Sequence, residues 1–600
     1  MGFNNPDVPW SEIERRLSDR PANRARRSEH PGDGGDSPAW SAHRVPYAPP
    51  PDLRAAAGAV PYAELHCHSS FSFLDGASSP EALVEEAVRL GLGALALTDH
   101  GGLYGVVRLA EAARELGLPT VFGAEVTLGA TTTRSGPPDP DGRHLVLLAR
   151  DPEGYACLSS LLSSAQMAGE KGRPRLSFAA LAEAASGRAR GHWAVLTGCR
   201  KGTVPAALVA EGPAAAAREL RTLVAAFGAE HTFVELWDHG DPLDSVRNDG
   251  LAELAVAAGV RLLATNNVHH ATPAERSVAA ALAAVRARRS LDDLDGWLPG
   301  GGGAHLRSGE EQARRFARWP GAVAAAAALG RDCAFDLSLV APRLPPYPCP
   351  PGPDGRPVTE MEYLRHLTAE GAVRRYGPRH AERIAGAWAQ IDHELALIDS
   401  LGFAGYFLLV ADIVDFCRRH DIYCQGRGSA ANSAVCFSLG VTKADAVRLG
   451  LLFERFLSPE RDGPPDIDLD IESGRREEVI QYVYERYGRT HAAQVANVIT
   501  YRARSAVRDA ARALGFSPGQ QDAWSKEMDR WGGVPAPGEA SDRQVGAPAP
   551  VLDLARQFQD LPRHLGIHSG GMVICDRPVV EVCPVAVSYT HLTLPTILLV

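Results

Sequence analysis

The chain of 600 residues lacks the features that would direct a protein into or across a membrane. No apolar run approaches the roughly 18 residues of a membrane span. The N-terminal stretch MGFNNPDVPWSEIERR has no apolar core of a signal peptide. Ten cysteines are scattered without a CxxC pair, which is typical of proteins in a reducing compartment. These absences predict a cytoplasmic protein with no membrane partner.

Lysine is also scarce, with four lysines against 58 arginines, which we attribute to the codon preference of a GC-rich genome. The formal net charge of −10 provides no overall positive field for nucleic acids. An enzyme acting on polynucleotides would therefore need local basic grooves.

The hydrophobic content of 45% is typical of a globular protein, and the length exceeds that of a single core, so we expect several domains.

The first part of the chain predicts a leader followed by a mixed α/β domain. Residues 1–58 are rich in Pro, Gly, Ser and Arg, and are expected to be disordered. Apolar strands alternate with Ala- and Leu-rich helices over 59–335, as in the strands 94–98 and 144–149 and the helix 106–117. This alternation predicts βα units, and hence a parallel sheet or barrel.

The second part begins with a proline-rich linker. LPPYPCPPGPDGRP (344–357) is unsuited to a helix or a central strand. A helical pattern follows over 359–420, and 475–530 is expected to be mainly helical. Between them lie a Gly-rich turn and a strand that carries several aspartates.

That strand, GPPDIDLDIES (463–473), alternates Asp466, Asp468 and Asp470 with aliphatic residues. Successive side chains of a strand point to opposite faces, so the three carboxylates share one face and repel one another. A bound hard cation such as Mg²⁺ would offset this repulsion. The alternatives are a solvated strand edge and a calcium loop, although the calcium loop requires Gly where Ile471 stands.

Polar side chains also follow three apolar strands of the first domain. ELHCHSSFSFLDG (64–76), GALALTDHGG (93–102) and RLLATNNVHH (261–270) each end in histidine with a carboxylate or an amide nearby. Barrel folds carry their chemistry at the carboxyl ends of strands. A lone histidine is usually structural, but three such clusters favour a metal site suited to Zn²⁺, Mn²⁺ or Fe²⁺.

With these motifs, residues 59–335 resemble the PHP (polymerase and histidinol phosphatase) family, a distorted (β/α)7 barrel with a multi-metal site. The resemblance implies the following metal ligands: His66, His68, Asp75, His100, Glu125, His144, Cys199 and His269. Asn267 stands where metal-competent members carry Asp. The site is therefore expected to hold fewer metals, or to serve structure instead of hydrolysis.

A Gly-rich turn precedes the aspartate strand. YCQGRGSAANSAVCFSLGVT (423–442) places two glycines before Ser429 and a helical stretch after it. Small residues let backbone N–H groups approach a phosphate, and the N-terminus of the following helix would add a favourable dipole. LLFERFLSPERDG (451–463) adds Arg455 and Arg461 as candidate phosphate clamps.

The ordered set GRGSAANS, LLFERFLSPER and PDIDLD resembles the palm of bacterial C-family (DnaE-type) DNA polymerases of the replicative alpha-subunit class. These enzymes carry an N-terminal PHP domain. Asn432, Asn267 and the VPWSE leader are similar to the error-prone, translesion branch. The resemblance implies that Asp466 and Asp468 bind two Mg²⁺ ions, with Asp470 as a supporting neighbour. It also implies these contacts to the incoming nucleotide: Gly428, Ser429 and Arg455.

The predicted fold class is therefore α/β and multidomain, with a PHP-type barrel, an incomplete polymerase-beta-like nucleotidyltransferase palm and a helical thumb. The expected boundaries are palm 336–497, thumb 498–562, returning palm segment 563–585 and a non-family, foreign tail 586–600. In the thumb, Arg504 and Arg508 lie four apart on one helical face. They would contact the DNA backbone, unless the helix is simply solvated.

The resemblance further implies a third catalytic aspartate after the returning segment GIHSGGMVI (566–574), and no match precedes Val600. We expect an inactive fragment of an error-prone DNA-directed DNA polymerase of DNA replication, repair and translesion synthesis. The implied partners are primer-template DNA, dNTPs, a sliding clamp and accessory mutasome proteins. The alternatives are a PHP-type metal-dependent phosphoesterase or 3′–5′ exonuclease, and a non-catalytic scaffold that binds DNA or mutasome proteins.

Overall fold

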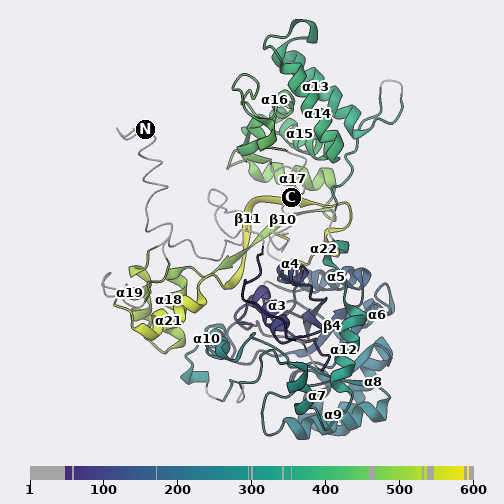
Figure 1. Cartoon of the computed structure of the whole chain (residues 1–600), viewed down its shortest axis with the longest axis vertical. Helices are drawn as coiled ribbons and strands as arrows, with labels where there is room; N and C mark the ends of the chain where they lie inside the picture. Colours follow the sequence, from purple (N-terminus) through teal and green to yellow (C-terminus); the bar gives the residue numbers. More distant parts are fainter. Residues whose placement is uncertain are drawn as a thin grey trace. The chain divides into compact units, whose positions relative to one another are not determined.

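The computed structural model describes residues 47–56, 60–170, 172–294, 296–298, 302–340, 343–352, 355–457, 467–529, 533–536, 546–586 and 591–592. Two compact units are present (Figure 1). Unit 1 comprises the described parts of 1–340, 496–567 and 583–596, and unit 2 those of 341–495 and 568–582. Most of the leader predicted at 1–58 lies outside the described residues, and so does Asp466.

Unit 1 contains a seven-stranded sheet whose strands follow one another in chain order. The strands are β1 (Ala63–Glu64), β2 (Ala94–Leu97), β3 (Thr120–Leu128), β4 (Arg143–Ala149), β5 (Trp193–Leu196), β6 (Thr232–Leu236) and β7 (Arg261–Ala264). Neighbouring strands are parallel, except that β4 runs antiparallel to β3 and β5. The sheet is therefore mainly parallel, as predicted, with β4 as an antiparallel insertion.

The two edges of this sheet approach each other just beyond β1 and β7. The N–H of His68 donates to the carbonyl of Val268 at 2.8 Å, and the N–H of Val268 donates to the carbonyl of His66 at 2.8 Å. Cys67 and Val268 thereby form a parallel bridge. The sheet is thus curled toward a barrel, which confirms the predicted PHP-type fold.

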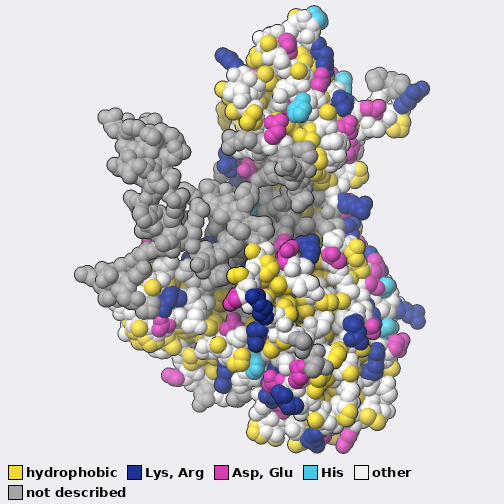
Figure 2. All heavy atoms as spheres, viewed as in Figure 1, with side chains coloured by type: hydrophobic (Ala, Val, Ile, Leu, Met, Phe, Trp, Pro, Cys, Tyr) yellow, Lys and Arg dark blue, Asp and Glu magenta, His cyan; other side chains and the backbone are white. Residues whose placement is uncertain are grey.

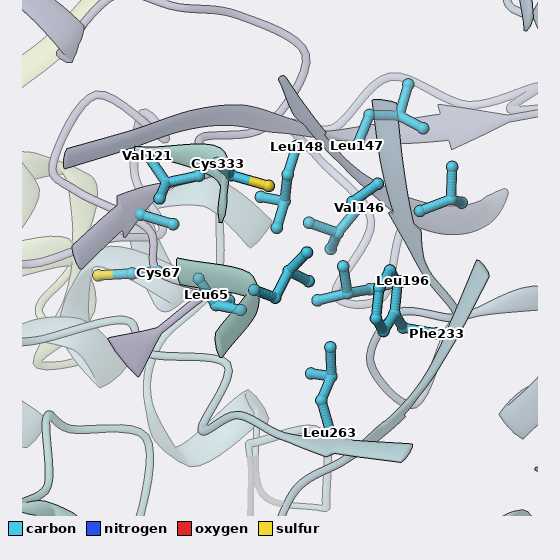
Figure 3. Packing of buried hydrophobic residues seen from close by; sticks show 14 of the residues in the cluster. Leu65, Cys67, Val121, Val146, Leu147, Leu148, Leu196, Phe233, Leu263 and Cys333 are labelled. Carbon is cyan, nitrogen blue, oxygen red and sulfur yellow. The ribbon is translucent and has the colours of Figure 1, made fainter. Parts of the chain in front are cut away.

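The sheet is apolar on both sides, because every residue of β2, β5 and β6 is buried. Strands buried on both faces consist of nearly continuous hydrophobic residues. Figure 3 shows Val146 and Leu196 packed on the same side of the sheet as Phe233 and Leu263 of neighbouring strands, with Leu147 pointing away from them. This interior fixes the strand ends from which the polar side chains project.

Helices connect and cover these strands. They are α3 (Pro80–Arg89), α4 (Val106–Leu116), α5 (Pro152–Ala168), α6 (Phe178–Ser186), α7 (Thr203–Glu211), α8 (Pro213–Phe227), α9 (Asp244–Ala258), α10 (Arg276–Ala287), α11 (Gly309–Arg315) and α12 (Ala322–Cys333), with the 3-10 turns η1 (Pro273–Glu275), η2 (Asp292–Leu294) and η3 (Leu337–Val340). The side chain of Asp151 accepts a hydrogen bond from the N–H of Gly154 and so caps α5. The predicted strands 94–98 and 144–149 and the predicted helix 106–117 are confirmed to within one residue.

A second core of unit 1 joins α10 to the helices α18 (Ala503–Ala513), α19 (Pro518–Glu527) and α21 (Ala549–Phe558). Val285 of α10 belongs to the same buried cluster as Val507 and Phe558. The helices predicted for the thumb are therefore present.

The small strands β12 (Val585–Ala586) and β13 (His591–Leu592) are antiparallel to each other.

The strand β10 (Ala492–Thr500) falls in a region predicted to be mainly helical. Its sequence AAQVANVIT contains Val495, Val498, Ile499 and Thr500, and β-branched side chains favour a strand. Together with β11 (Pro562–Ile574), β12 and β13 it forms a four-stranded sheet in the order β11–β10–β13–β12. The prediction of helix over 475–530 is therefore wrong at β10.

Unit 2 is mainly helical. It contains α13 (Glu360–Tyr376), α14 (Ala387–Leu401), α15 (Ala404–Arg419), α16 (Ala434–Leu439), α17 (Arg476–Tyr487) and α22 (Val579–Val582), the 3-10 turns η4 (Arg379–Ala381), η5 (Gly428–Asn432) and η6 (Phe453–Arg455), and the strands β8 (Cys424–Arg427) and β9 (Asp468–Ile471). Phe407, Phe453 and Phe456 are central to its core. The helical pattern predicted over 359–420 is confirmed, and the described part of the linker 344–357 has neither helix nor strand.

Among the described helices, none alone has the length and apolar content needed to cross a membrane. The helices α14 and α15 meet that test only as a pair bent by 117°. Residues of both helices, such as Ile398 and Phe407, are buried in the core of unit 2.

Leu147 allows the contribution of the barrel core to be measured. It is fully buried in β4, and we expect Leu147→Ala to lower the free energy of unfolding by about 2–5 kcal/mol, because the lost contacts leave a cavity. Urea unfolding followed by tryptophan fluorescence measures the change. Leu339→Ala is the matched control, since this side chain is 61% exposed and its loss should cost about 0.5 kcal/mol or less. Equal midpoints for the two variants would contradict the assigned core.

Candidate functional site

Glu125 on β3 is the centre of the histidine cluster in unit 1. Its Oε2 lies 2.9 Å from Nδ1 of His100 and 3.7 Å from Nε2 of His68. Its Oε1 lies 3.1 Å from Nδ1 of His144 and 3.4 Å from Nε2 of His66. Burial raises the pKa of Glu125, but His144 and His100 outweigh burial and lower it well below its usual range. The fold thus gathers four of the predicted histidine ligands around one carboxylate.

The ligand atoms of this cluster form three overlapping triads, each within 4.8 Å. They are His66–His68–Glu125, His100–Glu125–His144 and His68–His100–His269. Cys199 lies next to them, with its Sγ 3.5 Å from Nδ1 of His144. Imidazole and carboxylate donors at such separations suit Zn²⁺ or Mn²⁺.

Asp75 has a different environment from the other predicted ligands. Its Oδ2 lies 2.9 Å from Nε2 of His100 and 2.8 Å from Nη2 of Arg134, and Arg286 lies 3.8 Å from its Oδ1. Burial raises the pKa of Asp75, but Arg286 and His100 lower it well below its usual range. The guanidinium groups therefore share this carboxylate with the imidazoles. Both arginines were missed by sequence reasoning, because neither belongs to a strand-end motif.

Glu235 is a second residue that sequence reasoning missed. It is fully buried on β6, and its Oε1 lies 2.6 Å from Nδ1 of His66. A carboxylate on the far nitrogen fixes the orientation of a metal-binding imidazole. Burial lowers the pKa of His66, but Glu235 and Glu125 raise it to about 10. The available signal was the lone charge in the apolar strand TFVEL.

Asn267 occupies a special backbone position beside the cluster. Its φ is +41°, in a region that Asn and Asp tolerate better than other residues with side chains. Its side-chain oxygen is buried and has no hydrogen-bond partner among the described residues. Buried polar oxygens without a partner are costly, so this donor set fits a bound cation.

A cavity of about 1260 Å³ in unit 1 opens onto the cluster. Its lining includes Asp75, His100, Glu125, His144, Asn267 and His269. Arg134, Arg286, Arg200 and Lys201 also line it, and they provide the local positive charge that the net charge of the chain lacks. Figure 2 shows Lys and Arg interspersed with Asp and Glu on the described surface in view. An anionic substrate would therefore be attracted by the basic residues of the cavity wall, and not by the net charge of the chain.

In unit 2, the antiparallel pair β8–β9 brings the Gly-rich turn next to the aspartate strand. Arg427 is opposite Asp468 in this pair. Gly428 has a φ of +65°, which favours glycine. A Cβ atom placed on Gly428 would lie 3.8 Å from Oδ2 of Asp468. The Asp468 carboxylate is thus beside the residue that begins the turn carrying Ser429.

The alternation in β9 is confirmed. The side chains of Asp468 and Asp470 are 53% and 59% exposed, whereas Leu469 and Ile471 are partly buried against apolar clusters. Arg427 lies 3.1 Å from Oδ2 of Asp470 and 3.9 Å from Oδ2 of Asp468. The strand remains extended through Ile471, where a calcium loop would turn sharply.

The sequence predicts that the N-terminus of α16 faces a phosphate, but in the structure a carboxylate of the protein lies there. The carboxylate of Glu394 accepts hydrogen bonds from the N–H groups of Ala434, at 2.9 Å, and Val435, at 3.0 Å. An anion thus already occupies this helix end, and the predicted dipole contribution from α16 is wrong.

The arginines predicted to contact phosphate or DNA lie on two different elements, η6 and α18. Arg455 ends η6, and its side chain lies outside the described residues. On α18, Nε of Arg504 donates to the carbonyl of Met528 at 3.0 Å. Arg508 lies 3.8 Å from Asp522 and remains 49% exposed. Contact of either residue with DNA stays a prediction.

Two family models match the chain. The PHP domain matches residues 64–239, and the bacterial DNA polymerase III alpha NTPase domain matches residues 362–595. Residues 64–239 are therefore similar to PHP domains, and residues 362–595 are similar to the NTPase domain of bacterial DNA polymerase III alpha. The predicted DnaE-type resemblance and its PHP domain are therefore confirmed.

Among its relatives, the error-prone DNA polymerase of Nocardia farcinica is 55% identical over 98% of this chain and 53% of its own length. That of Mycolicibacterium paratuberculosis is 59% identical over 98% of this chain and 52% of its own length. These names confirm the likeness to the error-prone DnaE-type branch. The chain spans about half the length of these curated relatives.

A solved metal-dependent phosphoesterase from Bifidobacterium adolescentis matches 36% of this chain and 89% of its own length. The sequence identity is 19% and the TM-score is 0.25, which is too low to support any inference.

Asn267→Asp tests the metal site directly. The new carboxylate adds a charge where an amide oxygen has no partner, so we expect affinity for Mn²⁺ or Zn²⁺ to rise by roughly tenfold. Isothermal titration of the chain measures this change. Asn432 is the control position, because it belongs to unit 2 and is not among the residues of the metal-binding triads. Asn432→Asp should leave the metal affinity of unit 1 unchanged, and equal affinities for all forms would exclude Asn267 from the site.

Proposed function

We propose that the chain contributes the PHP domain and the first part of the polymerase region of an error-prone DNA-directed DNA polymerase. The observation that supports this most directly is the position of Asp468 beside Gly428 through the β8–β9 pair. The family match and the error-prone relatives agree with it. Because those relatives are about twice as long, the activity is proposed for the full-length protein.

The proposed reaction transfers a nucleotide from a dNTP to the 3′-hydroxyl of a primer. Asp468 and Asp466 would hold two Mg²⁺ ions, and Gly428 and Ser429 would contact the triphosphate. When bound, Mg²⁺ supplies Lewis-acid chemistry to the hydroxyl and to the leaving pyrophosphate. Asp468 fits this role, because its side chain is 53% exposed and its carboxylate lies beside the start of the turn. Arg455 would assist at the phosphates.

The remaining parts of the proposal concern DNA and partners. Residues 336–497 would form the first part of the palm and 498–562 the thumb, where Arg504 and Arg508 would approach the duplex backbone. Primer-template DNA and dNTPs are the proposed substrates, with a sliding clamp and mutasome proteins as partners. We place this polymerase in translesion synthesis and DNA repair in the cytoplasm, and the names of its error-prone relatives support the polymerase class.

Asp468→Asn in the full-length protein tests the polymerase proposal. Loss of one metal ligand should reduce primer extension about 100- to 1000-fold, because it removes roughly 3–4 kcal/mol of transition-state stabilisation. Single-turnover primer extension with Mg²⁺ measures the rate. Asp470→Asn is the matched control, because Asp470 is similarly exposed on the same strand but is not one of the proposed metal ligands. An undiminished rate for Asp468→Asn would rule out the proposed role.

A PHP hydrolase is the second candidate function, favoured by the three ligand triads that open onto a cavity with basic walls. We expect this chain to hydrolyse a terminal phosphodiester in the presence of Mn²⁺. Glu125→Gln should abolish both this activity and Mn²⁺ binding, because Glu125 belongs to two of the triads. Glu219→Gln, at an exposed site on α8, is the control. Release of nucleotides from labelled single-stranded DNA measures the activity, and equal release by both variants would exclude the cluster.

A further inference from the structure

We propose that Glu394 is a positioning residue for the nucleotide-binding turn η5 and that it acts by anchoring the start of α16. This inference deepens the proposed polymerase function and rests on it. Glu394 lies on α14, 39 residues before Ser433, and its side chain is fully buried. Neither the predicted ligands nor the predicted phosphate contacts include it.

The Glu394 carboxylate accepts four hydrogen bonds. Its Oε2 accepts from Oγ of Ser433 at 2.7 Å and from the N–H of Val435 at 3.0 Å. Its Oε1 accepts from the N–H of Ala434 at 2.9 Å and from Nε2 of Gln390 at 3.0 Å. Three of the four donors belong to the junction between η5 and α16. The carboxylate therefore joins two segments that are distant in sequence.

A buried acid without a cationic partner needs an explanation. Among the described residues, no Lys, Arg or His forms an ion pair with Glu394, and burial raises its pKa. Burial of a carboxylate costs several kcal/mol unless donors replace its water. Apolar residues would fill the same volume without this cost. We therefore attribute the presence of a carboxylate at this buried position to the N–H and O–H donors that it holds in place.

The anchored junction leads directly to the turn. The N–H of Ser433 donates to the carbonyl of Ala430 within η5 at 3.3 Å, and Oγ of Ser433 accepts from the N–H of Cys436 at 3.0 Å. On the other side of the turn, the N–H of Gly426 donates to the carbonyl of Val441 at 2.7 Å. One end of the turn is thus tied to the start of α16 and the other to Val441, two residues beyond its end, and the start of α16 is tied to Glu394. A displaced carboxylate would shift the N–H groups of η5 relative to Asp468.

Glu394 itself is not a phosphate ligand, because its negative charge would repel one. Its expected effect is on how well the turn matches the triphosphate, and therefore on the KM for dNTP. Glu394→Gln preserves the volume but replaces one acceptor oxygen with a donor, so one N–H or O–H donor of the junction faces another donor. Mispositioning of this kind should raise the KM for dNTP about tenfold, with a smaller change in kcat.

The experiment uses the full-length protein and steady-state primer extension with varied dNTP. Ser433→Ala removes one of the four hydrogen bonds and should raise the KM for dNTP in the same direction. Ser433→Thr retains the hydroxyl and should restore most of the wild-type value. Glu370→Gln, at an exposed position on α13, should leave the KM unchanged. The thermal midpoint and primer-template affinity of each variant are measured in parallel.

Three results decide the proposal. A raised KM for dNTP in Glu394→Gln and Ser433→Ala, with rescue in Ser433→Thr, supports it. An unchanged KM in both variants overturns it, as does a lowered thermal midpoint with an unchanged KM, which would indicate a structural role only. The proposed polymerase function fails separately, if Asp468→Asn retains full primer extension.

Discussion

A carboxylate in a protein interior must be surrounded by positive charge or by hydrogen-bond donors, because the water it loses stabilised its charge by several kcal/mol or more. Both candidate sites are built around such a group. Glu125 in unit 1 is surrounded by imidazoles, and Glu394 in unit 2 by N–H and O–H donors. The first environment can exchange its partners for a metal ion, whereas the second is saturated by the protein and serves to hold the backbone.

The need to compensate a buried carboxylate also explains which side chains the strands of unit 1 bring to Glu125 and Asp75. Glu125 on β3 can contact His66, His100 and His144 only because the chain places these residues at the ends of neighbouring strands. Arg134 and Arg286 then neutralise Asp75 at the edge of the cluster. The cavity beside them combines metal-binding side chains with basic walls, so an anionic group could reach the cluster without a positive charge on the chain as a whole.

Sequence reasoning succeeded where the chemistry lies in short local motifs. The histidines after apolar strands and the alternating aspartates of β9 were recognised, because the period of a strand fixes which side chains share a face. Glu235 and Glu394 were missed because their partners lie 169 and 39 residues away in the chain. The strand β10 was missed because its alanines also suit a helix, and its β-branched residues decide the outcome only when a neighbouring strand is present.

The occupied N-terminus of α16 constrains where a triphosphate can bind in unit 2. A helix of six residues whose first N–H groups are bonded to a carboxylate offers a phosphate neither donors nor favourable charge. The proposed contacts of a triphosphate are then the turn η5 and the metal ions that the carboxylates of β9 would hold. Both are next to Gly428, whose left-handed backbone starts the turn opposite Asp468. A phosphate bound there would be held by small residues and by charge, and the acid behind α16 would keep the turn from moving away.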